Sequence, residues 1–156
     1  MLDKIENILN NGEVWAIDLL PERCDDVRLF NEFEEILCKK SVKRTYIQRI
    51  LSIFVKIAVY YDSSMWIGDT RIISLKRYSN NAIGKNVKLS KKITIIRKIL
   101  WKDESISILL EPINAVLSLG LYNSAIILTN DTDKEILNQI VGSEGLFIWE
   151  NLDRRI

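Results

Sequence analysis

The chain has 156 residues, of which 47% are hydrophobic and 28% charged, and its formal net charge is +1. This composition argues against a disordered chain and fits one globular domain with a single hydrophobic core. Because the chain contains no histidine, a Ser-His-Asp triad, a Cys-His dyad and a histidine-ligated zinc site are excluded.

The first part of the chain predicts three helices and leaves one segment open. Apolar residues at helical spacing predict a short amphipathic helix over 2–11. Residues 14–20 are apolar almost throughout, a pattern that fits either a strand or a helical turn. Longer amphipathic patterns over 22–39 and 41–61 predict two helices that pack side by side as a hairpin, the second of them capped by Ser41.

In the middle of the chain, turn residues surround two short apolar runs. We expect one or two strands there, at 65–67 and 71–75. Trp66 is close to turn residues, which makes it a candidate for an exposed contact with a partner. Residues 91–102 favour a helix, although their β-branched content leaves a strand as the alternative.

The last third of the chain predicts a βαβαβ unit, in which three apolar runs alternate with two helical segments. The apolar runs span 106–110, 125–128 and 146–149. Pro112 and Gly120 mark the ends of the first helix, and Thr132 and Glu135 form a capping-box pattern at the second. Because the runs are continuously apolar, we expect parallel strands covered on both faces. The predicted fold is therefore α/β or α+β, with the helical hairpin packed on a small, at least partly parallel sheet.

Targeting and redox features indicate a cytoplasmic protein that does not enter the membrane. Asp3 and Glu6 stand where a signal peptide needs a basic start and an apolar run. The apolar stretch 47–61 is interrupted by charged residues and is shorter than the ~20 residues that cross a bilayer. Cys24 and Cys38 lie in helical apolar patterns, and we expect both to be reduced core residues.

Charge is segregated along the sequence. Residues 1–40 contain 10 acids and 5 bases, residues 41–102 contain 2 acids and 14 bases, and residues 103–156 contain 9 acids and 3 bases. One interpretation is that folding brings these segments together and neutralises them, since exposed ion pairs are common and each is worth only ~0–1 kcal/mol. The other is that a charged face survives on the surface and steers a charged partner.

Two acidic faces are candidates for binding a basic protein. If the βαβαβ reading holds, Glu111, Asp131, Asp133 and Glu150 all follow strand ends, where α/β sheets place their binding sites. The early helix carries a second group, formed by Asp25, Asp26, Glu32 and Glu35. The sequence contains no catalytic motif, and it predicts neither a cofactor nor a metal. The leading hypothesis is a non-enzymatic binding protein, by analogy an immunity-type inhibitor that neutralises a bacterial toxin such as a nuclease by covering its basic surface.

Two alternatives remain open. Asp131 and Asp133 suit a Mg²⁺ site of a phosphate-processing enzyme, although Asp131 also suits interaction with the start of the following helix. The basic segment 85–102 suits the phosphates of a nucleic acid, with Tyr78 and Trp101 as stacking surfaces. The cations of that segment are Lys85, Lys88, Lys91, Lys92, Arg97, Lys98 and Lys102.

Overall fold

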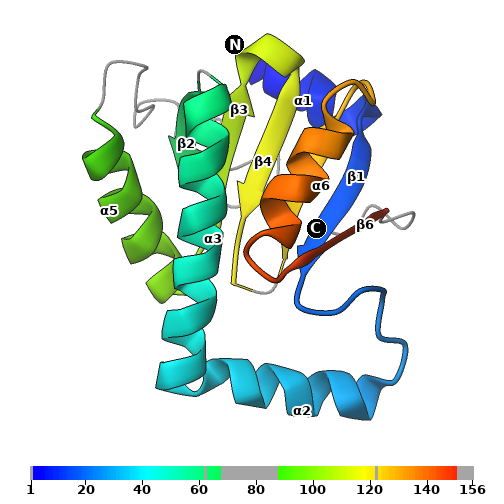
Figure 1. Cartoon of the computed structure of the whole chain (residues 1–156), viewed down its shortest axis with the longest axis vertical. Coiled ribbons are helices and arrows are strands. Elements are labelled where there is room, and N and C mark those ends of the chain that lie inside the picture. Colours follow the sequence, from blue (N-terminus) through cyan, green and yellow to red (C-terminus); the bar gives the residue numbers. More distant parts are fainter. Residues whose placement is uncertain (1, 62, 68–87, 122, 151–156) are drawn as a thin grey trace.

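The chain adopts an α+β fold built on one antiparallel sheet (Figure 1). The computed structural model describes residues 2–61, 63–67, 88–121 and 123–150. The strands are β1 (Glu13–Asp18), β2 (Ser63–Ile67), β3 (Ile106–Leu110), β4 (Ala115–Leu119), β5 (Ser124–Leu128) and β6 (Phe147–Glu150). The helices are α1 (Leu2–Asn11), α2 (Val27–Cys38), α3 (Lys40–Tyr60), α5 (Leu89–Trp101), the 3-10 turn η2 (Glu111–Ile113) and α6 (Lys134–Gly142). The described strands form a six-stranded sheet in the order β2-β3-β4-β5-β1-β6.

Every described strand pair is antiparallel, which corrects the predicted parallel βαβαβ unit. The three predicted strands are present as β3, β5 and β6, but the helix expected between Pro112 and Gly120 is not formed. There the chain makes η2, ends it at Asn114 in the left-handed conformation (φ 49°), and returns as β4. A surface helix needs a polar side, whereas Ser118 is the only polar residue of 115–119. The whole run is instead buried within the sheet.

The sheet is covered on both faces, which explains its continuously apolar strands. In Figure 1, α3, α5 and α6 lie over one face and α1 lies behind the other. Neighbouring residues of a strand point to opposite faces, so Ile108 belongs to the larger core and Leu109 to the smaller one. The larger core contains Ile50, Phe54 and Ile57 of α3. Ile5 and Ile8 of α1 and Val14, Leu109, Val116, Ala125 and Ile127 of the sheet form the smaller core.

The helix α2 does not form the predicted hairpin with α3. Figure 1 shows it projecting from the lower end of α3 rather than lying along that helix. Only Lys39, in an extended conformation, separates the two helices, whereas an antiparallel helical pair needs a loop of about two to five residues. The helix also begins at Val27 rather than at residue 22, because Asp26 caps it by accepting hydrogen bonds from the amides of Arg28 and Leu29.

Several local predictions are confirmed and others are wrong. The helix over 2–11 is α1, the open segment 14–20 is largely β1, and residues 91–102 are helical in α5. The strand expected at 71–75 lies outside the described residues. Ser41 does not cap α3, whose N-cap residue Lys39 makes no side-chain capping bond.

The predicted capping box at the start of α6 and the predicted burial of both cysteines are also wrong. The amide of Thr132 donates to the side chain of Asn130, and the N-cap residue of α6 is Asp133, which makes no side-chain capping bond. Cys38 is exposed and Cys24 is half-buried. In the part of the chain that the structure describes, no helix combines the length and apolar character needed to cross a membrane.

Candidate functional site

The antiparallel sheet gathers the first acidic group at one edge. The strands β3, β5 and β6 are separated by β4 and β1, which run in the opposite direction, so all three end at the same side of the sheet. Glu111 follows β3, Asp131 and Asp133 follow β5, and Glu150 is the last residue of β6. We call these four residues the acidic edge. They share an edge because alternate antiparallel strands point the same way, and not because the strands are parallel neighbours.

The four carboxylates of the acidic edge differ in how much of each a partner can reach. Asp131 and Glu150 are exposed, whereas Glu111 and Asp133 are half-buried. The hydroxyl of Tyr61, the residue after α3, donates a 2.7 Å hydrogen bond to Asp133. Burial, together with this hydrogen bond and the Asp133 charge, raises the pKa of Tyr61 to about 12. Asp133 therefore has a structural role, since it joins the end of α3 to the start of α6.

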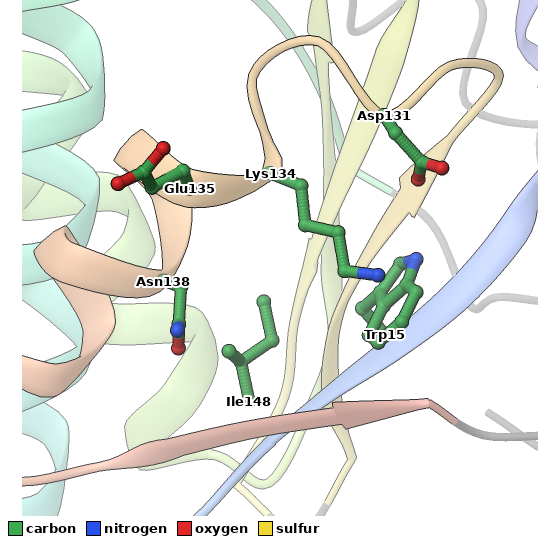
Figure 2. A pocket seen from close by; sticks show the side chains of 6 residues that line it. All are labelled: Trp15, Asp131, Lys134, Glu135, Asn138 and Ile148. Atoms are coloured by element: carbon green, nitrogen blue, oxygen red, sulfur yellow. The ribbon is translucent and has the colours of Figure 1, made fainter.

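An open pocket of about 380 Å³ lies at this edge. Its lining comes from β1, β6, the loop after β5 and the first turns of α6 (Figure 2). The lining residues are Trp15, Asp131, Lys134, Glu135, Asn138 and Ile148. Trp15 and Ile148 pack against the larger core, so the apolar floor of the pocket is anchored in the sheet while its polar groups come from the loop and α6.

The side chain of Lys134 lies across the pocket and ends over the indole ring of Trp15 (Figure 2). Its Nζ atom is 3.4 Å from the ring centroid, which is a close cation–π contact. Among the described residues, Lys134 forms no ion pair with a carboxylate. Asp131 and Glu135 line the same pocket, are exposed, and have no described cation partner. The Trp15 Nε1 atom is buried and has no hydrogen-bond partner among the described residues.

Four residues of this site were not predicted from the sequence as its members, namely Trp15, Lys134, Glu135 and Asn138. Glu135 and Asn138 stand three residues apart, a spacing that places them on one face of α6, so the polar wall was readable from the sequence. The position of Trp15 was not, because it depends on the insertion of β1 between β5 and β6.

The second acidic group lies on and just before α2, beside exposed apolar side chains. Asp25, Asp26, Glu32 and Glu35 are all exposed, Asp26 caps the helix, and Asp25 forms a 3.2 Å ion pair with Arg23. Val27 is 71% exposed and Leu29 is 50% exposed, and Phe30 and Ile36 are exposed as well. We call these four acids and four apolar residues the α2 surface. Val27, Phe30 and Ile36 belong to the amphipathic pattern that predicted a packed helix, and they are exposed because α2 projects from the body.

Trp66, the remaining candidate contact, is in β2 and pairs in register with Ser107 of β3. The placement of its side chain lies outside what the structure describes.

The basic segment forms the outer side of α5. Lys88, Lys91, Arg97, Lys98 and Lys102 are exposed and pair with no described carboxylate. Lys92 is only 7% exposed, so its predicted place in a phosphate-gripping strip is wrong. Lys85 and Tyr78 lie outside the described residues. Trp101 is exposed, with Lys43 Nζ 5.6 Å from its ring centroid.

Neutralisation between the charged segments is limited to a few contacts in the described part of the chain. Lys43 pairs with Asp103 at 2.6 Å, and Lys56 pairs with Glu144. Each of these ion pairs joins a cation of the basic middle segment to an acid of the last segment. Among the described residues, the carboxylates of Asp131 and Glu150 and the exposed α5 cations Lys91, Arg97 and Lys98 take no part in such pairs. Part of the charge segregation of the sequence therefore persists on the folded surface.

The arrangement around Asp131 and Asp133 gives the magnesium alternative little support. Among the described residues, no three acidic or cysteine side chains are grouped in a way that could hold a metal ion. One Asp133 oxygen is already engaged by Tyr61. No protein-family model, curated protein or solved structure matches this chain.

Proposed function

We propose that this chain is a non-enzymatic binding protein that captures a basic protein partner, and that it acts as an immunity-type inhibitor of a bacterial toxin domain such as a nuclease. The observation that carries the proposal is the acidic edge, where Asp131 and Glu150 are exposed and have no described cation partner, together with the adjoining pocket, which adds the exposed carboxylate of Glu135. An acidic surface of this kind complements the basic groove with which a nuclease holds nucleic acid.

The α2 surface adds exposed apolar side chains, which can become buried against a partner, to the carboxylates. Charges at the rim of an interface mainly raise the association rate, whereas most of the binding free energy comes from a few apolar or aromatic anchors that become buried. Leu29 and Phe30 of the α2 surface are exposed anchors of this type, and the neighbouring acids select a partner that is both basic and apolar. In Figure 1, α2 lies at the opposite end of the molecule from the start of α6, so we propose the α2 surface as a second, separate contact region for a basic protein.

The test first asks whether a gene next to the one for this chain encodes a toxin domain, and it uses that domain as the candidate partner; a neighbourhood without a toxin gene would count against the inhibitor proposal. In one variant the acidic edge is neutralised by Glu111→Gln, Asp131→Asn, Asp133→Asn and Glu150→Gln. In a second variant the α2 surface is neutralised by Asp25→Asn, Asp26→Asn, Glu32→Gln and Glu35→Gln. Both variants change the net charge equally, and asparagine at position 26 keeps a capping side chain. We expect each to weaken binding at least tenfold by calorimetry and to flatten its dependence on salt concentration.

A control variant neutralises two exposed acids outside both surfaces, with Glu22→Gln and Glu104→Gln, which is half the charge change of each test variant, and it is expected to retain the affinity of the natural chain. Wild-type affinity and salt dependence in the first variant would remove the acidic edge from the interface. Failure of the natural chain to bind the toxin domain or to restore growth of cells that express it would overturn the inhibitor proposal.

One observation favours nucleic-acid binding as a second candidate function. The outer side of α5 presents five exposed cations next to the exposed Trp101, which is a suitable arrangement for a phosphate backbone and a stacked base. This candidate predicts an affinity for single-stranded nucleic acid that falls steeply with salt and depends on Lys88, Lys91 and Lys98. A filter-binding titration in which the Lys88→Gln, Lys91→Gln, Lys98→Gln variant binds as tightly as the natural chain would reject it.

A further inference from the structure

We infer that the pocket at the acidic edge is a receptor for a single arginine side chain, and that Lys134 occupies this receptor until a partner supplies the arginine. The inference rests on the proposed function, since a protein partner provides the arginine. It goes beyond that proposal by naming the group that the pocket would bind, the guanidinium of one arginine of the partner.

The pocket already holds a cation. The Lys134 ammonium lies 3.4 Å from the centroid of the Trp15 ring, although two exposed carboxylates, Asp131 and Glu135, line the same pocket. The cation therefore rests on the aromatic face and leaves both carboxylates without a described cation partner. A positively charged group held on an indole, in a pocket lined by two acids that have no described cation partner, indicates a site that attracts cations.

A guanidinium group fits this set of surfaces better than the ammonium that occupies it. Its flat face stacks on an indole, and its fixed fork of N–H groups pairs with a carboxylate through two parallel hydrogen bonds. Asp131 and Glu135 offer such carboxylates, and the side-chain carbonyl of Asn138 offers a further acceptor. Ile148 lines the pocket beside the ring and suits the methylene groups of an arginine stem. An ammonium is more strongly hydrated and gains less from the same contacts.

The position of Lys134 makes the exchange possible. It is the first residue of α6, and the part of its side chain that covers Trp15 is the flexible stem with its terminal ammonium. An arriving arginine displaces only this side chain and leaves the sheet and α6 in place.

The experiment measures the pocket directly, with small probes and no toxin. The ¹⁵N-labelled chain is titrated with Nα-acetyl-arginine methylamide while the indole N–H signals of its four tryptophans are followed by NMR. The Trp15 signal is assigned as the one lost in Trp15→Phe. We expect this signal to shift saturably with a millimolar Kd, and we expect no shift with Nα-acetyl-citrulline methylamide, which has the same shape but no charge.

Two variants change the pocket in opposite directions. Lys134→Met keeps an apolar cover but removes the resident cation, and we expect it to tighten binding of the arginine probe at least threefold. Asp131→Asn with Glu135→Gln removes both carboxylates, and we expect it to weaken binding at least threefold. The matched control is Lys43→Met at the Lys43 and Trp101 pair, a cation over an indole outside the pocket, where the probe should leave the Trp101 signal unchanged in both the natural chain and the variant.

The inference is overturned if the Trp15 signal of Lys134→Met does not respond to the arginine probe, or if citrulline produces the same shift. Failure of this inference is distinguishable from failure of the proposed function. If the pocket binds arginine but the chain captures no toxin domain, the arginine-receptor inference stands and the inhibitor proposal is rejected. If the chain captures the toxin domain through the acidic edge but the pocket does not bind arginine, the inhibitor proposal stands and the arginine-receptor inference is rejected.

Discussion

Tyr61 and Asp133 are connected by a 2.7 Å hydrogen bond that joins the end of α3 to the loop before α6. Because the Tyr61 side chain is buried and the bond is made to a carboxylate, we expect Tyr61→Phe to lower the free energy of unfolding by about 1–2 kcal/mol. The measurement is urea denaturation at pH 8. The matched control is Tyr60→Phe at the neighbouring, exposed ring, which should change stability by less than about 0.5 kcal/mol.

The same hydroxyl predicts a loss of stability at high pH. Burial and the contact with Asp133 raise the pKa of Tyr61 from 10.0 to about 12 in the folded chain. A raised pKa means that the folded state favours the neutral hydroxyl, so its contribution is complete below pH 10 and is lost as the pH rises toward 12. Burial also raises the pKa of Tyr46, so the relevant quantity is the difference in stability between the natural chain and Tyr61→Phe. A constant difference between pH 8 and pH 11.5 would contradict the prediction.

The positions of the buried strands were predicted well from the sequence, whereas the direction in which neighbouring strands pair was not. Runs such as 106–110 and 125–128 are strands because their apolar residues fill both faces of a sheet. Their direction depends on the connection between them, and at residues 115–119 an apolar run without a polar side became β4 rather than a helix. The expectation of parallel pairing failed with that one element.

The site was predictable in part for a related physical reason. A residue that follows a strand lies at a sheet edge whichever way the strands pair, so the positions of Asp131 and Glu150 followed from local pattern. The pocket depends on contacts between distant segments. Trp15 meets α6 only because β1 pairs with β5 and β6, more than 100 residues further along the chain, and no local pattern contains that information.

Glu144 ties the loop after α6 to the middle of α3, and we expect this contact to weaken in acid. Burial raises the pKa of its carboxyl, but hydrogen bonds from Lys56 and Ser52 outweigh burial and leave the pKa below its usual value of 4.5. With a lowered pKa in the folded state, the stabilisation is present above pH 4.5 and is lost as the pH falls through the folded-state pKa. We expect Glu144→Gln to be less stable than the natural chain by about 1 kcal/mol at pH 7, with a smaller difference at pH 3. The control is Glu104→Gln at an exposed site, and an equal difference at both pH values would count against the prediction.

Gly12 fills the tight turn between α1 and β1, and we expect Gly12→Ala to destabilise the chain. A Cβ atom at this position would lie 2.6 Å from Cγ2 of Ile127 and 2.7 Å from the carbonyl oxygen of Ile8. The second contact is with backbone, which cannot rotate away, so we expect a loss of about 1–3 kcal/mol in thermal or urea unfolding. The matched control is Gly142→Ala at the end of α6, where nothing lies within 4 Å. The higher helix propensity of alanine should leave that variant at least as stable as the natural chain, and equal stability of the two variants would show that the turn adapts.

The apolar side chains of the α2 surface should matter for binding and hardly at all for stability. Leu29 and Ile36 are exposed on a helix that projects from the body, so Leu29→Gln with Ile36→Gln should change the free energy of unfolding by less than about 0.5 kcal/mol. Leu37, next to Ile36 in the same helix, is buried in the larger core, and Leu37→Ala should lower the free energy of unfolding by about 2–5 kcal/mol. In calorimetric titrations with the basic toxin domain, the double variant should lose at least tenfold in affinity while its urea midpoint stays unchanged. If the double variant unfolds as readily as Leu37→Ala, Leu29 and Ile36 belong to the core. If it binds the toxin domain as tightly as the natural chain, Leu29 and Ile36 are not part of the interface.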